Sequence, residues 1–249
     1  MPLTADPGAQ AEYSDIGFII LGVALERIAG EPLDTFCQRE IFGPLGMSNT
    51  TFNPPRELRA KIPPTADERE ECGAGAPARE LPAARPHSGG GHQKARSTLR
   101  NRIIKGEVQD ENAFVQGGVA GHAGLFSTAE DVARFAHVML SEGGPILRPE
   151  TIALFTRREG SPAGTSRALG WDTPSAPSQS GTHFGPHSYG HLGYTGTSLW
   201  IDPDRQLSIT LLTNRTWPEC SNQSIKQVRP KIHNALQERV RNSLNRGDR

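Results

Sequence analysis

Two runs rich in β-branched and aliphatic residues lie near the C-terminus, at residues 198–202 and 206–213, and only residues 203–205 separate them. A connection this short joins antiparallel strands, because parallel neighbours need a crossover of a dozen or more residues. The hairpin therefore excludes a parallel Rossmann sheet. Segments with helical periodicity precede and follow it, so the predicted fold class is α/β in the broad sense (α+β), an antiparallel sheet flanked by helices in layers.

Five segments have the apolar periodicity of helices: residues 16–30, 33–41, 127–140, 149–154 and 225–240. The first ends at Gly30, which tolerates the left-handed conformation of a helix C-cap. The second stops before Gly43-Pro44, so these two helices are expected to form a hairpin. Ser127 and Glu130 match a capping box, in which each side chain binds the backbone N–H of the other residue.

The charge balance excludes several classes of partner. The 249 residues carry 27 basic and 27 acidic side chains, and the pI is near 7.1. A general nucleic-acid binder or a protein bound to anionic membranes needs a positive surface, which this balance does not provide. No apolar stretch approaches the roughly 20 residues of a membrane span. The first residues also lack the pattern of a secretory signal.

The number and spacing of the cysteines exclude two further ways of organising a fold. Cys37, Cys72 and Cys220 lie far apart in the sequence with no Cys-x-x-Cys spacing. A disulfide framework or a zinc ribbon is therefore excluded as the organising principle of the fold.

Residues 72–102 differ in composition from the rest of the chain. They are rich in Gly, Pro, Ala and basic residues, with only Leu81 and Leu99 as large apolar residues. Such a segment cannot bury a core, so we expect a disordered insertion within a single domain that spans residues 1–249. The charged residues between 66 and 102 are interpreted as solvated.

Three segments combine reactive side chains with glycines. Tyr13-Ser-Asp15 lies just ahead of the first predicted helix, residues 117–128 are Gly-rich, and His191 begins a second Gly-rich run that extends to residue 197. A phenol, with a pKa of about 10, accepts a proton from a hydroxyl only where neighbouring cations or donors favour its anion. Gly-rich backbone lets N–H groups approach a developing oxyanion without a side chain in the way.

In their order and spacing, these segments resemble the serine β-lactamase and penicillin-binding-protein superfamily, specifically its class C-like branch with the related DD-peptidases and carboxylesterases. The resemblance extends to residues 44–52 and 211–215. It implies a β-lactamase/transpeptidase-like layered fold. It also implies a serine hydrolase that acts on a small ester, amide or peptide through an acyl-serine, with no metal or organic cofactor. Members of this family are commonly periplasmic or secreted.

The resemblance assigns catalytic roles to three residues. Tyr13 matches the tyrosine that acts as the proton-shuttling base, and Asp15 matches the asparagine of the same motif. His191 stands at the position of the lysine or histidine that lines the opposite wall. Asp15 in place of asparagine is expected to raise the pKa of Tyr13 unless a cation compensates.

The same resemblance places the substrate-binding wall at Gly193, Tyr194 and Thr195, with the backbone N–H of Tyr194 as one half of the oxyanion hole. Leu192 stands where the family has threonine, which removes a hydroxyl that could bind a substrate carboxylate. Histidine in place of lysine at position 191 is a variation found among esterase-like and peptidase-like members of the family, and it favours their activity over penicillin hydrolysis.

The nucleophile motif of the superfamily is absent from these 249 residues. In Ser-x-x-Lys the lysine lies one helical turn from the serine and activates its hydroxyl. No serine of the chain has lysine three positions later. The family places this motif well upstream of the tyrosine. The chain is therefore expected to begin inside the domain, as about its C-terminal two-thirds, without the N-terminal strands and the nucleophile helix.

Two other interpretations remain open. The chain could be a non-catalytic ligand-binding remnant of the fold. It could also be a metal-binding module, because His183, His187 and His191 recur every four residues, although the glycines and proline among them make a helical face improbable. His122 is interpreted as a residue that packs a loop, outside the catalytic set.

Overall fold

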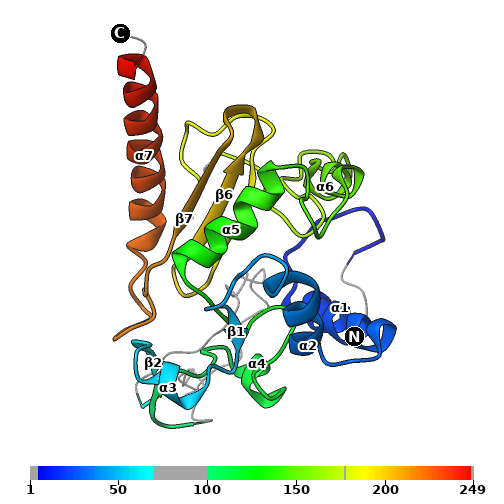
Figure 1. Cartoon of the computed structure of the whole chain (residues 1–249), viewed down its shortest axis with the longest axis vertical. Coiled ribbons are helices and arrows are strands. Elements are labelled where there is room, and N and C mark those ends of the chain that lie inside the picture. Colours follow the sequence, from blue (N-terminus) through cyan, green and yellow to red (C-terminus); the bar gives the residue numbers. More distant parts are fainter. Residues whose placement is uncertain (1–4, 70–99, 177, 248–249) are drawn as a thin grey trace, which may run out of the picture.

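The computed structural model describes residues 5–69, 100–176 and 178–247 (Figure 1). Its helices are α1 (Asp15–Ala29), α2 (Leu33–Cys37), α3 (Arg56–Arg59), α4 (Glu111–Val115), α5 (Ala129–Leu140), α6 (Pro149–Thr156) and α7 (Ile225–Gly247), with a π-helical turn η1 (Gln38–Phe42) and a 3₁₀ turn η2 (Pro203–Arg205). Its strands are β1 (Thr51–Phe52), β2 (Pro64–Asp67), β3 (Ile103–Lys105), β4 (Leu125–Phe126), β5 (Tyr189–Leu192), β6 (Ser198–Asp202) and β7 (Leu207–Leu211).

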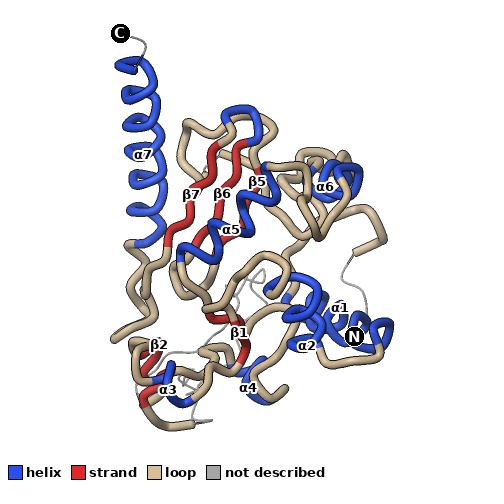
Figure 2. Tube along the Cα trace, viewed as in Figure 1, coloured by secondary structure: helices blue, strands red, loops and turns tan. Residues whose placement is uncertain are grey.

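The main sheet has the order β5-β6-β7 and is antiparallel throughout (Figure 2). The predicted hairpin is confirmed, because β6 and β7 pair from Ser198↔Leu211 to Asp202↔Leu207 around the turn η2. Two small antiparallel ladders, β1-β4 and β2-β3, lie outside this sheet. In the described residues, helices and antiparallel strands therefore combine as expected for an α+β chain.

The core lies between α5 and the main sheet. Ala136 and Met139 of α5 pack against Tyr189 of β5 and Ile201 of β6, and all four are buried. Figure 1 shows α5 crossing one face of the sheet. Helix α7 contacts the start of β6, where the hydroxyl of Ser198 lies 3.2 Å from Nε2 of His233. In the part of the chain that the structure describes, no helix is both long enough and apolar enough to cross a bilayer.

The N-terminus of α5 differs from the prediction by one residue. Thr128, rather than Ser127, is the N-cap, and its side chain accepts the N–H of Asp131 at 3.3 Å. Asp131 is buried and accepts the N–H of Asn49 at 2.7 Å and the hydroxyl of Thr50 at 2.9 Å. The predicted capping box does not form, because the Ser127 hydroxyl pairs with that of Thr50 at 2.7 Å and the Glu130 carboxylate accepts from Arg134 at 2.8 Å.

The first helices agree with their sequence pattern. Ser14 caps α1 by accepting the N–H of Gly17, and Gly30 ends it in the left-handed conformation at φ 71°. The side chain of Glu26 then accepts the N–H of Leu33 at 2.9 Å, which ties α1 to α2 as the predicted hairpin.

The Gly-rich segment 117–124 packs closely on α1. A Cβ atom at Gly22 would lie 2.9 Å from the backbone nitrogen of Gly121, and one at Gly121 would lie 2.2 Å from the carbonyl oxygen of Phe18. Both glycines are therefore required by the approach of the two backbones. This contact fixes the loop that carries His122 against the helix that follows Tyr13.

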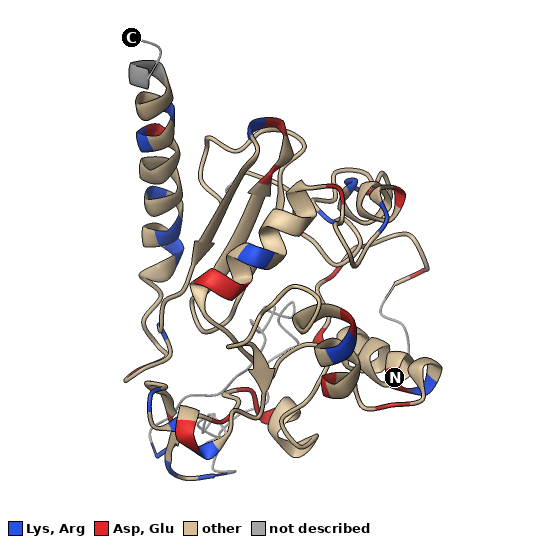
Figure 3. Cartoon of the chain, in the orientation of Figure 1, with Lys and Arg blue, Asp and Glu red and all other residues tan. Residues whose placement is uncertain are grey.

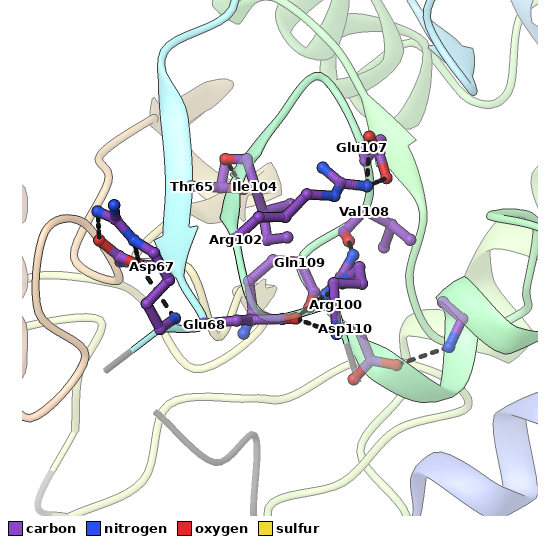
Figure 4. Close-up of polar contacts among 12 residues, drawn as sticks. Thr65, Asp67, Glu68, Arg100, Arg102, Ile104, Glu107, Val108, Gln109 and Asp110 are labelled. Carbon is purple, nitrogen blue, oxygen red and sulfur yellow. Dashed lines mark hydrogen bonds and ion pairs between the residues drawn. The ribbon is translucent and has the colours of Figure 1, made fainter. Parts of the chain in front are cut away.

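The interpretation of residues 66–102 as solvated charge is wrong at both ends of that range. Glu68 and Arg100 form an ion pair whose side chains are 3% and 2% exposed (Figure 4). The pair is buried because β2 and β3 bring the two residues together beneath the aromatic ring of Phe114. Residues 70–99 lie outside the described part of the chain, so the insertion and the single domain stay predictions.

Candidate active site

Two residues far apart in the sequence, Tyr13 and His191, meet in the structure. Their ring centroids are 5.9 Å apart with an interplanar angle of 43°. Tyr13 directly precedes the N-cap of α1, and His191 lies on β5 opposite Leu199 of β6. The start of a helix and a strand of the main sheet therefore present one phenol and one imidazole side by side. Both groups transfer protons in enzymes.

Arg167 is a third member of this cluster that the sequence analysis missed. Its guanidinium carbon lies 5.6 Å from the centroid of the Tyr13 ring, and its Nη1 atom is 3.2 Å from a carboxylate oxygen of Asp172. The backbone of Asp172 bridges to Gly190, beside His191. No short motif surrounds Arg167, so the sequence held no signal for its position.

The surroundings of Tyr13 keep its hydroxyl protonated. Burial raises the pKa of Tyr13, and so do the charge of Asp15 and a hydrogen bond to that carboxylate. Asp110 adds a further increase in the pKa, and only Arg167 lowers it. The expected effect of Asp15 is thus confirmed, since the single cation does not compensate. A phenol in this state donates a hydrogen bond and does not act as a base until another cation approaches.

The pKa of His191 shifts downward, in the direction opposite to that of Tyr13. Burial lowers the pKa of its imidazole, the charge of Asp172 opposes this effect, and the charge of Arg167 adds to it. The imidazole is therefore mainly neutral at pH 7, so it can both donate and accept a hydrogen bond.

The residues proposed for the oxyanion wall form the turn between β5 and β6. The N–H of Gly193 donates to the carbonyl of Thr197 at 2.8 Å, and a Cβ at Gly193 would lie 2.0 Å from the hydroxyl of Thr197. A side chain at position 193 would therefore force the Thr197 side chain to move. The ring of Tyr194 lies 4.2 Å from the guanidinium carbon of Arg215, and the carbonyl of Thr195 accepts the backbone N–H of Arg215 at 2.9 Å.

We expect Asp15→Asn to lower the pKa of Tyr13. The substitution removes both the negative charge and the charged acceptor that stabilise the protonated phenol, while the contribution of burial remains. NMR titration of ring-labelled tyrosine measures this, because Tyr13, Tyr189 and Tyr194 are the only tyrosines in the chain.

Asp204→Asn is the matched control, because this carboxylate pairs with His187 rather than with Tyr13. A Tyr13 titration that is the same in Asp15→Asn as in the unchanged chain would contradict the electrostatic assignment.

The three histidines that recur every four residues, His183, His187 and His191, do not come together as a metal site. His183 pairs with Glu238 and His187 with Asp204, while His191 faces Tyr13. Among residues 5–69, 100–176 and 178–247, no three metal-binding side chains gather in one place. The side chain of His122 is buried, with its Nε2 atom 2.8 Å from a carboxylate oxygen of Asp110, as suits a residue that packs a loop.

Known proteins match nearly all of the chain. The Beta-lactamase family model matches residues 1–229. A protein of Salmonella agona (strain SL483) named "Putative D-alanyl-D-alanine carboxypeptidase" is 36% identical over 233 residues, which cover 90% of this chain and 50% of the relative. The chain thus spans about half the length of the curated relatives it matches.

Two solved structures share the fold. A β-lactamase from Mycobacterium bovis has a TM-score of 0.61 at 18% identity, covering 94% of this chain and 66% of that one. A mutant of simvastatin synthase from Aspergillus terreus has a TM-score of 0.63 at 18% identity, covering 97% and 58%. The predicted β-lactamase/transpeptidase-like fold is therefore confirmed. The family-model match over residues 1–229 shows that this chain belongs to the Beta-lactamase family, a family of serine hydrolases.

Proposed function

We propose that this chain supplies the proton-transfer and oxyanion wall of a serine hydrolase of the carboxylesterase or DD-peptidase type. The observation that carries the proposal is the contact between the rings of Tyr13 and His191, on segments that the resemblance assigns to catalysis. In the proposed reaction the serine hydroxyl attacks the carbonyl carbon of an ester or amide. Its proton passes to the leaving group by way of Tyr13, and water then hydrolyses the acyl-serine.

The charges around Tyr13 indicate what the site still requires. The carboxylates of Asp15 and Asp110 raise the pKa of Tyr13, and among the described residues only the cation Arg167 acts against them. An ammonium group beside the phenol would lower that pKa and turn a hydrogen-bond donor into a base. A Ser-x-x-Lys segment would bring both the nucleophile and this cation, so the acidic environment of Tyr13 complements its lysine.

An apolar face of α1 offers a place for such a segment. The side chains of Ile16, Ile20, Leu21 and Ile28 are 51%, 63%, 52% and 83% exposed. Large apolar side chains exposed together on one helix indicate an interaction site or a site of self-association. Ile16, the first of these residues, lies within one helical turn of Tyr13 in sequence. The side chains of a helix packed on this face would therefore lie close to the phenol.

A labelling experiment tests the proposal. The 249-residue chain is treated with a fluorophosphonate probe, alone and together with the N-terminal segment of a β-lactamase family member that carries Ser-x-x-Lys. We expect no label on the chain alone, because an activated serine is required. We expect label on the serine of the added segment in the mixture.

The control is the same segment with its serine replaced by alanine, which should abolish labelling in the mixture. A chain that becomes labelled alone would contain an unrecognised nucleophile, and the proposed division of roles would be wrong. A mixture that binds but is never labelled would identify the chain as a ligand-binding remnant of the fold.

A further inference from the structure

Every carbonyl group in the turn from Gly193 to Thr197 accepts a hydrogen bond. Within the turn, the N–H of Gly196 donates to the Gly193 carbonyl at 3.0 Å. Arg215 donates to two carbonyls, from Nε to Tyr194 at 2.6 Å and from its backbone N–H to Thr195 at 2.9 Å. The Thr213 hydroxyl donates to the Gly196 carbonyl at 2.7 Å, and Nη2 of Arg229 donates to the Thr197 carbonyl at 3.1 Å. Most of these donors lie outside the turn. The turn is thus held by its carbonyls, and its peptide planes have little freedom to rotate.

Two arginines provide the charged part of this support. Arg229, on α7, is 3% exposed, and its Nη1 atom donates to the side-chain carbonyl of Gln179 at 2.6 Å, which fixes the guanidinium plane. Its Nη2 atom also lies 3.5 Å from the carbonyl of Gly193. Arg215 packs over the ring of Tyr194 and donates to Cys220 O at 3.0 Å. Lys and Arg recur along α7 (Figure 3), but Arg229 is the one that reaches into this turn.

Arg229 approaches from the face of the sheet that is opposite to His191. Residues paired across antiparallel strands lie on the same face. His191 pairs with Leu199, which packs with the core beneath α5, whereas Leu192 pairs with Ser198, whose hydroxyl is 3.2 Å from His233 of α7. The helix that carries Arg229 therefore lies behind the sheet relative to Tyr13 and His191.

Burying Arg229 beside another arginine is costly. Burial and the charge of Arg215 both lower the pKa of Arg229. A buried guanidinium needs strong acceptors to offset the loss of water, and like charges repel. Hydrophobic residues would fill the same space with less penalty, so the arrangement indicates a role other than stability.

We propose that Arg215 and Arg229 are positioning residues. They hold the carbonyls of Gly193, Tyr194, Thr195 and Thr197, so that the N–H groups of Tyr194 and Thr195 are directed toward the side of Tyr13 and His191. The physical basis is the trans peptide unit, in which C=O and N–H point in opposite directions. The carbonyls of Gly193 and Tyr194 belong to the same peptide units as the N–H groups of Tyr194 and Thr195. The positive charge of Arg229 behind the turn also favours negative charge in front of it.

This inference rests on the proposed function for the identity of the negative charge, which would be the oxyanion of an ester or amide during attack. The support of the turn itself does not depend on that function. The experiment is therefore chosen to report on the backbone of the 249-residue chain whether or not the chain is active.

The test measures ¹⁵N order parameters of backbone N–H groups in Arg215→Met, Arg229→Met and the unchanged chain. In the unchanged chain, the order parameters of Tyr194 and Thr195 should be near the roughly 0.85 of rigid backbone, and in each variant they should fall below about 0.6. The N–H groups of Gly193 and Gly196 donate within the turn, so their exchange with solvent should become about tenfold faster or more in each variant. A tenfold change corresponds to about 1.4 kcal/mol in the free energy of opening.

Arg239→Met is the matched control, because Arg239 is an exposed arginine on the same helix. It should leave the turn unchanged. Arg215→Lys keeps a charged donor near Tyr194 O and should restore part of the order. If Arg229→Met does not fold, the order parameters of Arg215→Met test the proposal, because Arg215 is less buried.

Order parameters at Tyr194 and Thr195 that match the unchanged chain in the methionine variants would overturn the proposal. An equal loss of order throughout β5, β6 and β7 would also overturn it, because the arginines would then act only on general stability.

With a Ser-x-x-Lys segment added, the turn-specific role further predicts that each methionine variant has a kcat about tenfold lower or more, with little change in KM, since removing a whole oxyanion donor costs about 10²–10³ in kcat. An inactive mixture would count against the proposed function and leave the order-parameter result to decide the role of the arginines.

Discussion

Arg100→Met is expected to destabilise the fold by about 3–5 kcal/mol, because it leaves the carboxylate of Glu68 buried without its cation. The backbone N–H and Nε of Arg100 donate to Glu68 at 3.0 and 2.8 Å, and Nη2 donates to the same carboxylate. Further bonds reach the carbonyls of Val108 at 2.6 Å and Gln109 at 2.8 Å (Figure 4). The guanidinium carbon also lies 4.5 Å from the centroid of the Phe114 ring. The Arg100 side chain thus joins three parts of the chain, which are the end of β2, the segment between β3 and α4, and α4 itself.

Urea unfolding measures this effect, and Arg102→Met is the matched control two residues away. Arg102 pairs with Glu107, but its side chain is 47% exposed, so its loss should cost about 1 kcal/mol or less. The double variant Glu68→Leu/Arg100→Met should recover much of the lost stability, because no buried charge remains unpaired. Similar free energies of unfolding for Arg100→Met and Arg102→Met would contradict the assignment of Glu68–Arg100 as a buried pair.

The elements that could be predicted from the sequence are those whose signal is local. Gly30 ends α1 because its own backbone adopts φ 71°, and the residues 203–205 between β6 and β7 leave room only for a tight turn. Periodicity alone did not identify the buried face of α7, however. Arg229, His233 and Gln237 are buried there, whereas the apolar residues Val228, Leu236 and Val240 are between 41% and 45% exposed.

What could not be predicted depends on contacts between distant segments. The resemblance placed Tyr13 and His191 on one site, but nothing in the sequence indicated that Arg167 would lie beside them or that Asp110 would act on the same phenol. The burial of Glu68 and Arg100 was likewise hidden, because a charged residue in a Gly- and Pro-rich region looks solvated until its partner is known. The capping box at Ser127 fails for a related reason, because the hydroxyl of Ser127 pairs with that of Thr50, which is far away in sequence.

Tyr13→Phe should abolish most of the ester hydrolysis that appears when a Ser-x-x-Lys segment is added to the chain. The substitution removes the hydroxyl that would transfer the proton and keeps the ring against His191 and Arg167. Positioned acid–base groups contribute about 10²–10⁴ in rate, so kcat should fall by about that factor, with a small change in KM because the contact surface is retained. The measurement is hydrolysis of a p-nitrophenyl ester under saturating added segment, with binding of the segment checked separately.

Tyr189→Phe separates catalysis from the loss of a tyrosine hydroxyl in general. Tyr189 is buried on β5, two residues before His191, and burial raises the pKa of its phenol to about 12. Its hydroxyl has no hydrogen-bond partner among the described residues, so the substitution should leave hydrolysis unchanged. Equal rates for Tyr13→Phe and the unchanged chain would remove Tyr13 from the mechanism. In that case the contact between Tyr13 and His191 would only join the start of α1 to the sheet.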